Sequence, residues 1–221
     1  MEDTPLIWLP ENFHGPFPSP RLAMLDPDGL LAAGVNLNPD TILQAYRQGI
    51  FPWYSGDQPI LWWSPNPRCV LFPDKFHVSR SFRRSLNQHR FEIRLDTAFR
   101  EVMQACAEPR ADQDGTWITD EMLDAYCTLH AMGYGHSVEC WQDNELVGGI
   151  YGLQIGSVFF GESMFSRRKD ASKVAMHHIC TVLKPALVDA QVYSEHLETL
   201  GAELIERENF CRLLNMHATQ S

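Results

Sequence analysis

The sequence lacks the features that define several protein classes. Its six cysteines are scattered, with no CxxC pair and no zinc-ligand spacing, which excludes a zinc ribbon and predicts reduced, buried thiols. The longest apolar stretch, residues 146–161, is interrupted by polar side chains and contains five glycines, so it is not a membrane span. The acidic start, Met1 to Thr4, has none of the basic and apolar regions of a secretory signal. We therefore expect a cytoplasmic location.

Positive charge is also scarce, because 18 Lys and Arg face 28 Asp and Glu, for a net charge of −10. This balance excludes a general nucleic-acid coat. The cations are concentrated in residues 68–100, with a net charge of +5, and residues 167–173, with +3. Most of the cations are Arg, whose planar group suits phosphate. A solvated helix face is the alternative for residues 79–90. The candidate contacts to nucleic acid are Arg80, Arg83, Arg84, Arg167, Arg168 and Lys169.

The length of 221 residues allows one compact domain or two small ones. The first 38 residues are rich in Pro and Gly, which predicts an extended segment that wraps a body rather than regular structure. A helix is expected to begin after Asn38, with Pro39 at its first position, and to end at Gly49. Trp53, Trp62 and Trp63 follow it in a loop or edge-strand context.

Apolar periodicity then predicts an α+β chain. Its helices are expected at 79–88, 96–107, 119–133, 171–183, 194–200 and from about 206. Its strands are expected at 136–141, 145–153 and 157–162, which form an antiparallel meander, and at 187–192. One mixed, mostly antiparallel sheet would therefore carry the functional site. We expect residues 1–100 to form a smaller N-terminal domain and residues 101–221 the catalytic domain.

Two polar groups stand out because they interrupt apolar strands. Glu162 lies among aromatic and thioether side chains, where burial disfavours a charge, so it needs a partner. That partner is either a structural Arg or a ligand in a pocket. Asp189 and Gln191 are two residues apart on a strand and would share a face. If buried, they hydrogen-bond to neighbours or to a ligand, unless one of them satisfies the backbone of a bulge.

Aromatic and imidazole side chains are further candidates. Trp53, Trp62, Trp63 and Trp117 could stack on a base, although most tryptophans in small domains are core or lid residues, and we expect at most two of the four to touch a ligand. His136 and His196 are possible bases, but lone histidines are more often structural.

Many short motifs occur in an order that resembles one known family. They are Asp28 to Gly34, Ala45 to Trp53, Trp62 to Arg68, Ser79 to Ser81, Gly115 to Ile118, His136 to Glu139, Leu146 to Gly149, Gly161 to Ser166, Ala171 to Lys173 and Asp189 to Gln191. Between about residue 17 and about residue 214, the chain is similar to the leucyl/phenylalanyl-tRNA–protein transferases. The resemblance implies a small N-terminal domain followed by a domain like the Gcn5-related N-acetyltransferases, which agrees with the element order above.

The resemblance also implies a reaction. Leu or Phe, and less readily Met, would pass from aminoacyl-tRNA to the α-amino group of a protein that begins with Arg or Lys, marking it for N-end rule degradation. No cofactor and no metal are expected, and a monomer is the default. By similarity, Asp189 orients and polarises Gln191, whose side-chain oxygen receives or relays the amine proton. Glu162 would hold an amino group of a bound substrate.

The family pattern assigns the remaining site residues to binding. Trp53 and Trp117 would border the 3′-terminal adenosine, with Tyr46 close by. The apolar pocket for the Leu or Phe side chain would be formed by Ile150, Phe159, Met164 and Ile179. Ile150 and Ile179 stand where larger Met or Phe can occur, which could alter the preference for Phe over Leu. In addition, residues 34–37 read Gly-Val-Asn-Leu where the family usually has Gly-Gly-Asp-Leu.

Two other functions remain open from the residues. The fold alone suggests a coenzyme-A-dependent N-acetyltransferase, but residues 167–171 contain no glycine to bind a pyrophosphate through backbone N–H groups. A noncatalytic module that binds RNA or peptide would explain the basic segments and the tryptophans. It would leave Glu162, Asp189 and Gln191 without a task.

Overall fold

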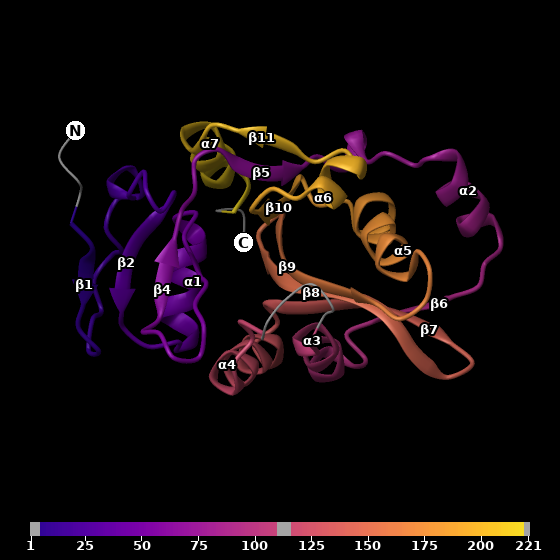
Figure 1. Cartoon of the computed structure of the whole chain (residues 1–221), viewed down its shortest axis with the longest axis horizontal. Helices are drawn as coiled ribbons and strands as arrows, with labels where there is room; N and C mark the ends of the chain where they lie inside the picture. The colour runs from indigo at the N-terminus through magenta and orange to yellow at the C-terminus, as the bar shows by residue number, and fades with distance from the viewer. Residues whose placement is uncertain (1–4, 110–115, 219–221) are drawn as a thin grey trace.

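The computed structural model describes residues 5–109 and 116–218. Gly115, which begins one of the motifs, and Met1 to Thr4 lie outside the described residues. The described chain forms two sheets with helices around them, a four-stranded sheet in the order β1-β2-β4-β3 and a seven-stranded sheet in the order β11-β5-β10-β9-β8-β7-β6 (Figure 1). The predicted α+β class is therefore confirmed.

The small sheet corrects the expectation for the N-terminal segment. It contains β1 (Ile7–Leu9), β2 (Leu30–Gly34), β3 (Phe51–Pro52) and β4 (Leu61–Trp63). The prediction that the first 38 residues lack regular structure was wrong, because their Pro and Gly residues occupy the turns that flank β1 and β2. Gly34 ends β2 with a φ of +95°, and a Cβ at this position would lie 2.3 Å from the carbonyl oxygen of Leu9.

The tryptophan pair lies on an inner strand rather than in a loop or on an edge. Strand β4 pairs with β2 on one side and with β3 on the other. Trp62 is completely buried, and its Nε1 donates to the carbonyl oxygen of Gly34 at 2.9 Å. The edge-strand expectation therefore fails for Trp62 and Trp63.

The first helix forms as its residues predict. Helix α1 (Pro39–Arg47) begins with Pro39, and the side chain of Asn38 accepts a hydrogen bond from the Thr41 N–H at 2.8 Å. Gly49 follows the helix with a φ of +77°, a conformation that glycine adopts without strain. Helix α1 thereby carries Tyr46 to the junction with the large sheet.

The large sheet contains the predicted meander and extends it. The meander consists of β7 (Gly135–Gln142), β8 (Glu145–Ile155) and β9 (Val158–Ser166), and β10 (Leu187–Gln191) pairs with β9 in parallel. Three shorter strands complete the sheet, β5 (Arg68–Leu71), β6 (Glu92–Leu95) and β11 (Glu203–Ile205). The domain boundary near residue 100 stays a prediction, and β5 and β6, which precede it, lie in the large sheet.

The helices agree with the predicted positions, with one shifted start. They are α2 (Arg80–Asn87), α3 (Phe99–Ala107), α4 (Asp120–Ala131), α5 (Ala171–His178), α6 (Glu195–Thr199) and α7 (Arg207–His217), and the π-helical turn η3 (Ile179–Leu183) continues α5. The helix predicted to begin at Asp96 begins instead at Phe99, and Asp96 does not cap it. Its φ is +57°, and its carboxylate accepts the Ser137 N–H at 2.7 Å. Glu139 instead accepts the N–H groups of Thr97 and Ala98, each at 3.1 Å.

Two apolar clusters cover the faces of the large sheet. Figure 1 shows α3 and α4 on one face and α5 on the other. The larger cluster joins α3, α4 and the small sheet, whereas the smaller cluster lies under α5. A Cβ on Gly148 of β8 would lie 2.4 Å from the Cβ of Ala171, so glycine permits α5 to approach the sheet closely.

Other predictions concern cysteine and membrane features. All six cysteines are free thiols, and four of them are buried. Among the described residues, no helix combines the length and hydropathy needed to cross a membrane. Residues 5–109 and 116–218 also contain no group of three or more His, Cys, Asp or Glu side chains placed to bind a metal ion.

Candidate active site

Glu162 is the centre of a buried polar cluster at the junction of the two sheets. It lies on β9 beside a register irregularity opposite Tyr151 and Gly152. Its carboxylate accepts hydrogen bonds from the hydroxyl of Tyr46 at 2.7 Å, the hydroxyl of Tyr126 at 3.2 Å and Nε2 of Gln191 at 2.8 Å. We call these four side chains the Glu162 cluster. Its members come from α1, α4, β9 and β10.

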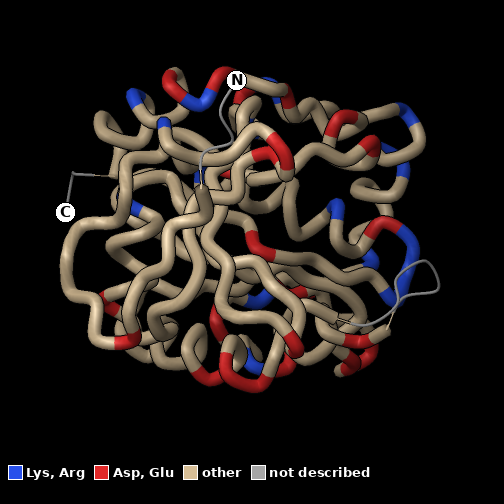
Figure 2. The backbone as a smooth tube through the Cα atoms, turned by 60° about the vertical axis from the view of Figure 1, so that its left-hand side comes forward, with Lys and Arg blue, Asp and Glu red and all other residues tan. Residues whose placement is uncertain are grey.

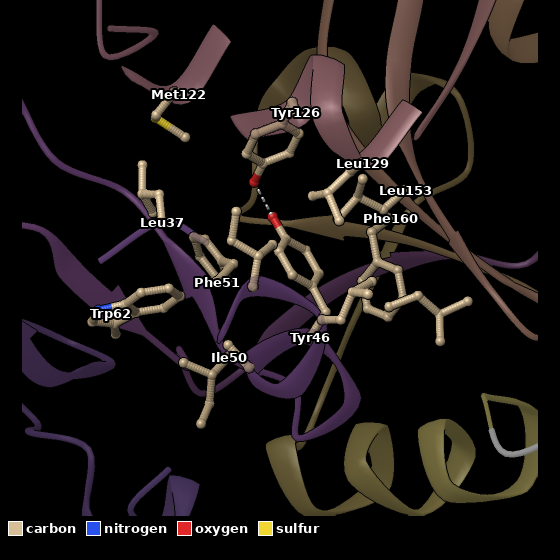
Figure 3. Packing of buried hydrophobic residues seen from close by; sticks show 14 of the residues in the cluster. Leu37, Tyr46, Ile50, Phe51, Trp62, Met122, Tyr126, Leu129, Leu153 and Phe160 are labelled. Atoms are coloured by element: carbon tan, nitrogen blue, oxygen red, sulfur yellow. Dashed lines mark hydrogen bonds between the residues drawn. The ribbon is translucent and has the colours of Figure 1, made fainter. Parts of the chain in front are cut away.

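The two tyrosines also contact each other. Their hydroxyl oxygens lie 2.7 Å apart, and Figure 3 shows the two rings converging from α1 and α4. Burial raises the pKa of both hydroxyls well above their ordinary values, and the nearby Glu162 raises them further. Both hydroxyls therefore remain protonated. Each has a single proton, so two hydroxyl protons are shared among three contacts, one between the tyrosines and two to the carboxylate.

The environment of Glu162 shifts its own titration. Burial raises its pKa from an ordinary value of 4.5 to about 7, even though the hydrogen bonds from Tyr46, Tyr126 and Gln191 act in the opposite direction. Every hydrogen-bond donor to Glu162 from the described part of the chain is uncharged. Pairing with a structural Arg, one of the two predicted alternatives, is therefore wrong. Near neutral pH, Glu162 can exist with or without its proton.

Asp189 has a different partner. Its two carboxylate oxygens accept hydrogen bonds from Nε and Nη2 of Arg68 at 2.8 and 2.7 Å, and both side chains are buried. The oxygen that faces Nε also accepts the backbone N–H of Gln191 at 2.9 Å. The pairing of β10 with β5 shifts register between Asp189 and Gln191, and Gln191 has a φ of +61°. Asp189 thus satisfies the backbone of a bulge, which was one of the predicted alternatives.

This bulge changes how Asp189 reaches Gln191. The resemblance implied that Asp189 polarises the Gln191 side chain, whereas the contact in the structure is to the Gln191 backbone N–H. The side-chain amide of Gln191 turns instead toward Glu162, to which its nitrogen donates. Asp189 therefore orients Gln191 through the main chain.

Two residues of the site were missed from the sequence. Tyr126 falls within the helix predicted over 119–133, where its position in the apolar spacing of the helix gave no sign of a role for its hydroxyl. Arg68 was quoted within a motif but given no role. A signal for Arg68 existed, because a cation that begins the apolar run Cys69 to Leu71 needs a buried anion. Asp189, in another apolar strand, is that anion.

The four residues predicted for an apolar pocket lie mainly on the α5 face of the sheet. Ile150, Phe159 and Ile179 are buried in the smaller cluster, and Met164 is half-buried against it. Met164 also lines a cavity of about 340 Å³ together with Arg167 and His196. The structure therefore brings these four apolar residues together on the face opposite Tyr46 and Tyr126, which belong to the larger cluster.

The tryptophans predicted to contact the terminal adenosine differ in exposure. Trp53 is 42% exposed, and its ring centroid lies 5.6 Å from that of Trp63. Trp117 is half-buried against the larger cluster. The hydroxyls of Tyr54 and Thr119 lie 3.3 Å apart, so the segments that carry Trp53 and Trp117 meet beside the N-terminus of α4.

The predicted basic contacts lie on two separate surfaces. Arg80, Arg83 and Arg84 are exposed on α2, and none of them forms an ion pair with a described carboxylate. In the loop before α5, Arg167 pairs with Glu108, Arg168 lies 4.0 Å from Glu145, and Lys169 is exposed. In Figure 2, basic positions gather toward the right of the view and acidic positions along its lower edge.

Neither candidate histidine contacts the Glu162 cluster. His136 Nδ1 lies 2.8 Å from a carboxylate oxygen of Asp96, which raises the pKa of His136. His196 is exposed at the rim of the Met164 cavity. His136 is therefore a structural partner of the turn before α3.

Comparison with protein families identifies the family of this chain. Residues 70–215 match the model of the leucyl/phenylalanyl-tRNA protein transferases, and residues 35–66 match the model of their N-terminal domain. The chain belongs to the leucyl/phenylalanyl-tRNA–protein transferase family. The identification made from the motifs is thereby confirmed, and the chain is an enzyme, an aminoacyltransferase.

Individual relatives extend this family match along most of the chain. A leucyl/phenylalanyl-tRNA–protein transferase from Aromatoleum aromaticum is 58% identical over 198 residues, which are 88% of this chain and 84% of the relative. Another, from Pseudomonas putida, is 53% identical over 218 residues, 97% of this chain and 96% of the relative.

Solved structures resemble the chain less closely. A Gcn5-related N-acetyltransferase from Kribbella flavida matches 76% of this chain and 61% of its own, with a TM-score of 0.35 and 14% identity. A likeness at this score says nothing about the ligands or the activity of this chain.

Proposed function

We propose that this enzyme transfers leucine or phenylalanine, and less readily methionine, from aminoacyl-tRNA to the α-amino group of proteins that begin with Arg or Lys. Membership of the family supports aminoacyl transfer from tRNA to protein N-termini. The observation that carries the chemistry is the buried carboxylate of Glu162, which is surrounded by uncharged donors and has a pKa of about 7. The product would carry a signal for N-end rule degradation.

The reaction is the aminolysis of an ester. The amine nitrogen attacks the ester carbonyl carbon, a new amide bond forms, and the bond to the ribose oxygen of the tRNA breaks. The nucleophile is an α-amine with a pKa of ~7.7–8.0, so a base of nearly matching pKa can take its proton. Glu162 is that base in this proposal, and the proton ends on the ribose oxygen. Holding the ester and the amine together supplies much of the remaining rate.

Gln191 has an orienting role in the same proposal. Its amide nitrogen is occupied by Glu162, which leaves the amide oxygen as an acceptor for the N–H of the incoming amine. An amide is a weak base, so Gln191 aligns the amine while Glu162 takes the proton. Asp189 holds Gln191 in place through the backbone N–H.

The donor would be held by residues that lie on both faces of the large sheet. Trp53 and Trp117 would border the terminal adenosine, with Tyr46 nearby. The Leu or Phe side chain would enter the apolar group of Ile150, Phe159, Met164 and Ile179, and the flexible thioether of Met164 suits both shapes. The exposed arginines of α2 and the basic residues before α5 would contact tRNA phosphates.

Coenzyme A chemistry has less support. The loop before α5 contains no glycine, and the first N–H groups of this helix are already used within the chain. The Ala171 N–H donates to the carbonyl oxygen of Arg168 at 3.1 Å, and the Ser172 N–H donates to the side chain of Ser166 at 3.3 Å. A pyrophosphate would have to displace both contacts.

The proposed function is tested by transfer of labelled Phe or Leu from its tRNA to a protein with N-terminal Arg. The same protein with N-terminal Gly is the matched acceptor control, and acetyl coenzyme A is offered in a parallel reaction. We expect label only on the Arg acceptor and no acetylation. Acetylation without aminoacyl transfer would overturn the proposal. We also propose that the protein is cytoplasmic and that it is a monomer. Size-exclusion chromatography with light scattering tests the oligomeric state.

A further inference from the structure

Arg68 is a fully buried cation that begins strand β5, and each of its three guanidinium nitrogens donates a hydrogen bond. Nε and Nη2 donate to the two oxygens of Asp189 at 2.8 and 2.7 Å, and Nη1 donates to the carbonyl oxygen of Gly49 at 3.2 Å. The group also lies between two rings, 4.7 Å from the centroid of Phe51 and 4.6 Å from that of Phe210. Arg68 is therefore held rigidly.

A buried ion pair of this kind is a weak source of stability. Removing two charges from water costs as much as their attraction returns, and apolar replacements are often as stable. What such a pair provides is a fixed geometry, if other groups depend on its position. The atoms that Arg68 and Asp189 contact therefore indicate what the pair is for.

One branch of contacts leads from Arg68 to Gln191. Arg68 fixes the carboxylate of Asp189, and Asp189 accepts the N–H of Gln191 at 2.9 Å. Gln191 has a φ of +61°, a conformation that a residue with a side chain adopts only when its surroundings impose it. In that conformation the Gln191 amide donates to Glu162.

The other branch leads from Arg68 to Tyr46. Nη1 of Arg68 holds the carbonyl oxygen of Gly49, and the N–H of Gly49 donates to the carbonyl oxygen of Tyr46 at 3.0 Å. This contact fixes the last turn of α1, from which the Tyr46 hydroxyl donates to Glu162. A single arginine is thus connected to two of the three donors of Glu162, and both of these donate to the same carboxylate oxygen, Oε1.

We infer that Arg68 is a positioning residue for aminoacyl transfer, because it sets the places of Gln191 and Tyr46 relative to Glu162 without touching a substrate. The inference rests on the proposed function of the Glu162 cluster. It also gives Asp189 a role that involves no proton transfer. Asp189 is a fixed anion that transmits the position of Arg68 to the bulge.

The first test is Arg68→Lys, which keeps the charge and loses the planar fork. Displacement of reacting groups by about 1 Å costs about 100-fold in rate, so we expect kcat to fall about 100-fold. The KM for aminoacyl-tRNA should stay within about threefold, because no substrate contact is removed. The kcat profile should also move to a higher apparent pKa, since two donors to the Glu162 carboxylate are loosened.

Arg207→Lys is the matched control. Arg207 is half-buried at the start of α7, and its Nη1 donates to the carbonyl oxygen of Ser64 at 2.6 Å, but no hydrogen bond joins it to Asp189 or Gly49. It should lower the melting temperature to a similar extent and leave kcat within about twofold, as expected of an interaction absent from the site. If both variants fold and lose equal kcat, the inference is wrong.

A second test separates position from charge. Asp189→Asn can still accept the Gln191 N–H but leaves the Arg68 cation without a counter-charge. Arg68→Gln/Asp189→Asn removes both charges and retains a pair of amides that can hydrogen-bond. We expect the double variant to have about tenfold higher kcat than Asp189→Asn alone, because contacting residues couple. A folded double variant with the kcat of the wild type would show that the Arg68 fork is not needed to position the Glu162 cluster, and would overturn the inference.

The wild-type assay separates this inference from the proposed function. A wild-type protein that transfers no aminoacyl group overturns both. An active wild type in which Arg68→Lys behaves like Arg207→Lys overturns the role of Arg68 alone.

Discussion

Asp189 and Glu162 lie on neighbouring strands, and both carboxylates are buried, yet they are held in opposite ways. Asp189 faces a full positive charge, the guanidinium of Arg68. Glu162 faces two hydroxyls and an amide. A carboxylate that is paired with a guanidinium is held in a fixed position by it, whereas a buried carboxylate that is solvated only by dipoles has a raised pKa. The difference teaches that burial alone does not identify the reactive acid, because the charge of its partners decides the outcome.

A third buried carboxylate extends the comparison. Glu139 accepts hydrogen bonds from the N–H groups of Thr97 and Ala98 and from the hydroxyls of Thr97 and Ser137. These donors lie at the start of α3 and on β7, away from the Glu162 cluster. Glu139 therefore anchors a helix, which makes it the structural reference for the other two carboxylates.

The largest effect on kcat is expected from Glu162→Gln, which removes the carboxylate that takes the proton and leaves Asp189 unchanged. Loss of a general base costs about 10²–10⁴-fold in rate, so kcat should fall by about three orders of magnitude. Binding of aminoacyl-tRNA, measured by filter retention, should change little. A variant that keeps wild-type kcat would show that Glu162 takes no proton.

The effect of Glu162→Gln on the free energy of unfolding should depend on pH. The folded-state pKa of Glu162 is raised from 4.5 to about 7, so its contribution to stability is present below about pH 4.5 and is lost as the pH rises through about 7. Between these limits the loss is about 3 kcal/mol. Relative to wild type, Glu162→Gln should gain about this much as the pH rises from about 4 to about 8. Denaturant unfolding across this range measures the difference, and a constant difference would contradict it.

Glu139→Ala should lower stability and leave kcat nearly unchanged, whereas Glu162→Gln lowers kcat. It leaves the donors at the start of α3 unsatisfied, at a cost of about 1–3 kcal/mol. Because Glu139 is remote from the Glu162 cluster, kcat should remain within about twofold. Thermal unfolding together with a transfer assay checks both outcomes. A large loss of kcat in a folded variant would show that Glu139 contributes to the active site.

The smallest effect is expected from Tyr126→Phe, which tests how much one uncharged donor contributes to the properties of Glu162. This change removes the longer of the two tyrosine contacts to Glu162, at 3.2 Å, while Tyr46 still donates at 2.7 Å. We expect a decrease in kcat of about fivefold, in line with about 1 kcal/mol for one hydrogen bond. The apparent pKa of the kcat profile should rise, because a donor to the charged form is lost. An unchanged profile would exclude Tyr126 from the cluster.

The sequence predicted the parts of the fold that depend on local pattern. The helix cap at Asn38 and the meander of β7 to β9 follow from capping chemistry and from a change of apolar period. The short strands β5 and β6 were missed, because four residues carry too little pattern to separate a strand from a loop. The shifted start of α3 has a similar cause, since its anchor, Glu139, is distant in sequence.

The site was predictable only in part. Glu162 and Asp189 were conspicuous as acids in apolar strands, but their partners were not. Arg68 lies 121 residues from Asp189 along the chain, and Tyr46 lies 116 residues from Glu162. Such pairings depend on which strands become neighbours. The bulge that turns Gln191 toward Glu162 is also a product of this tertiary arrangement.

The central claim is that Glu162 titrates near neutral pH. Carbon-13 NMR of protein labelled at the side-chain carboxyl carbons of Glu tests it directly, with Glu162→Gln used to assign the signal. We predict a Glu162 signal that titrates near 7. A Glu162 signal that titrates near its ordinary 4.5 would contradict the account.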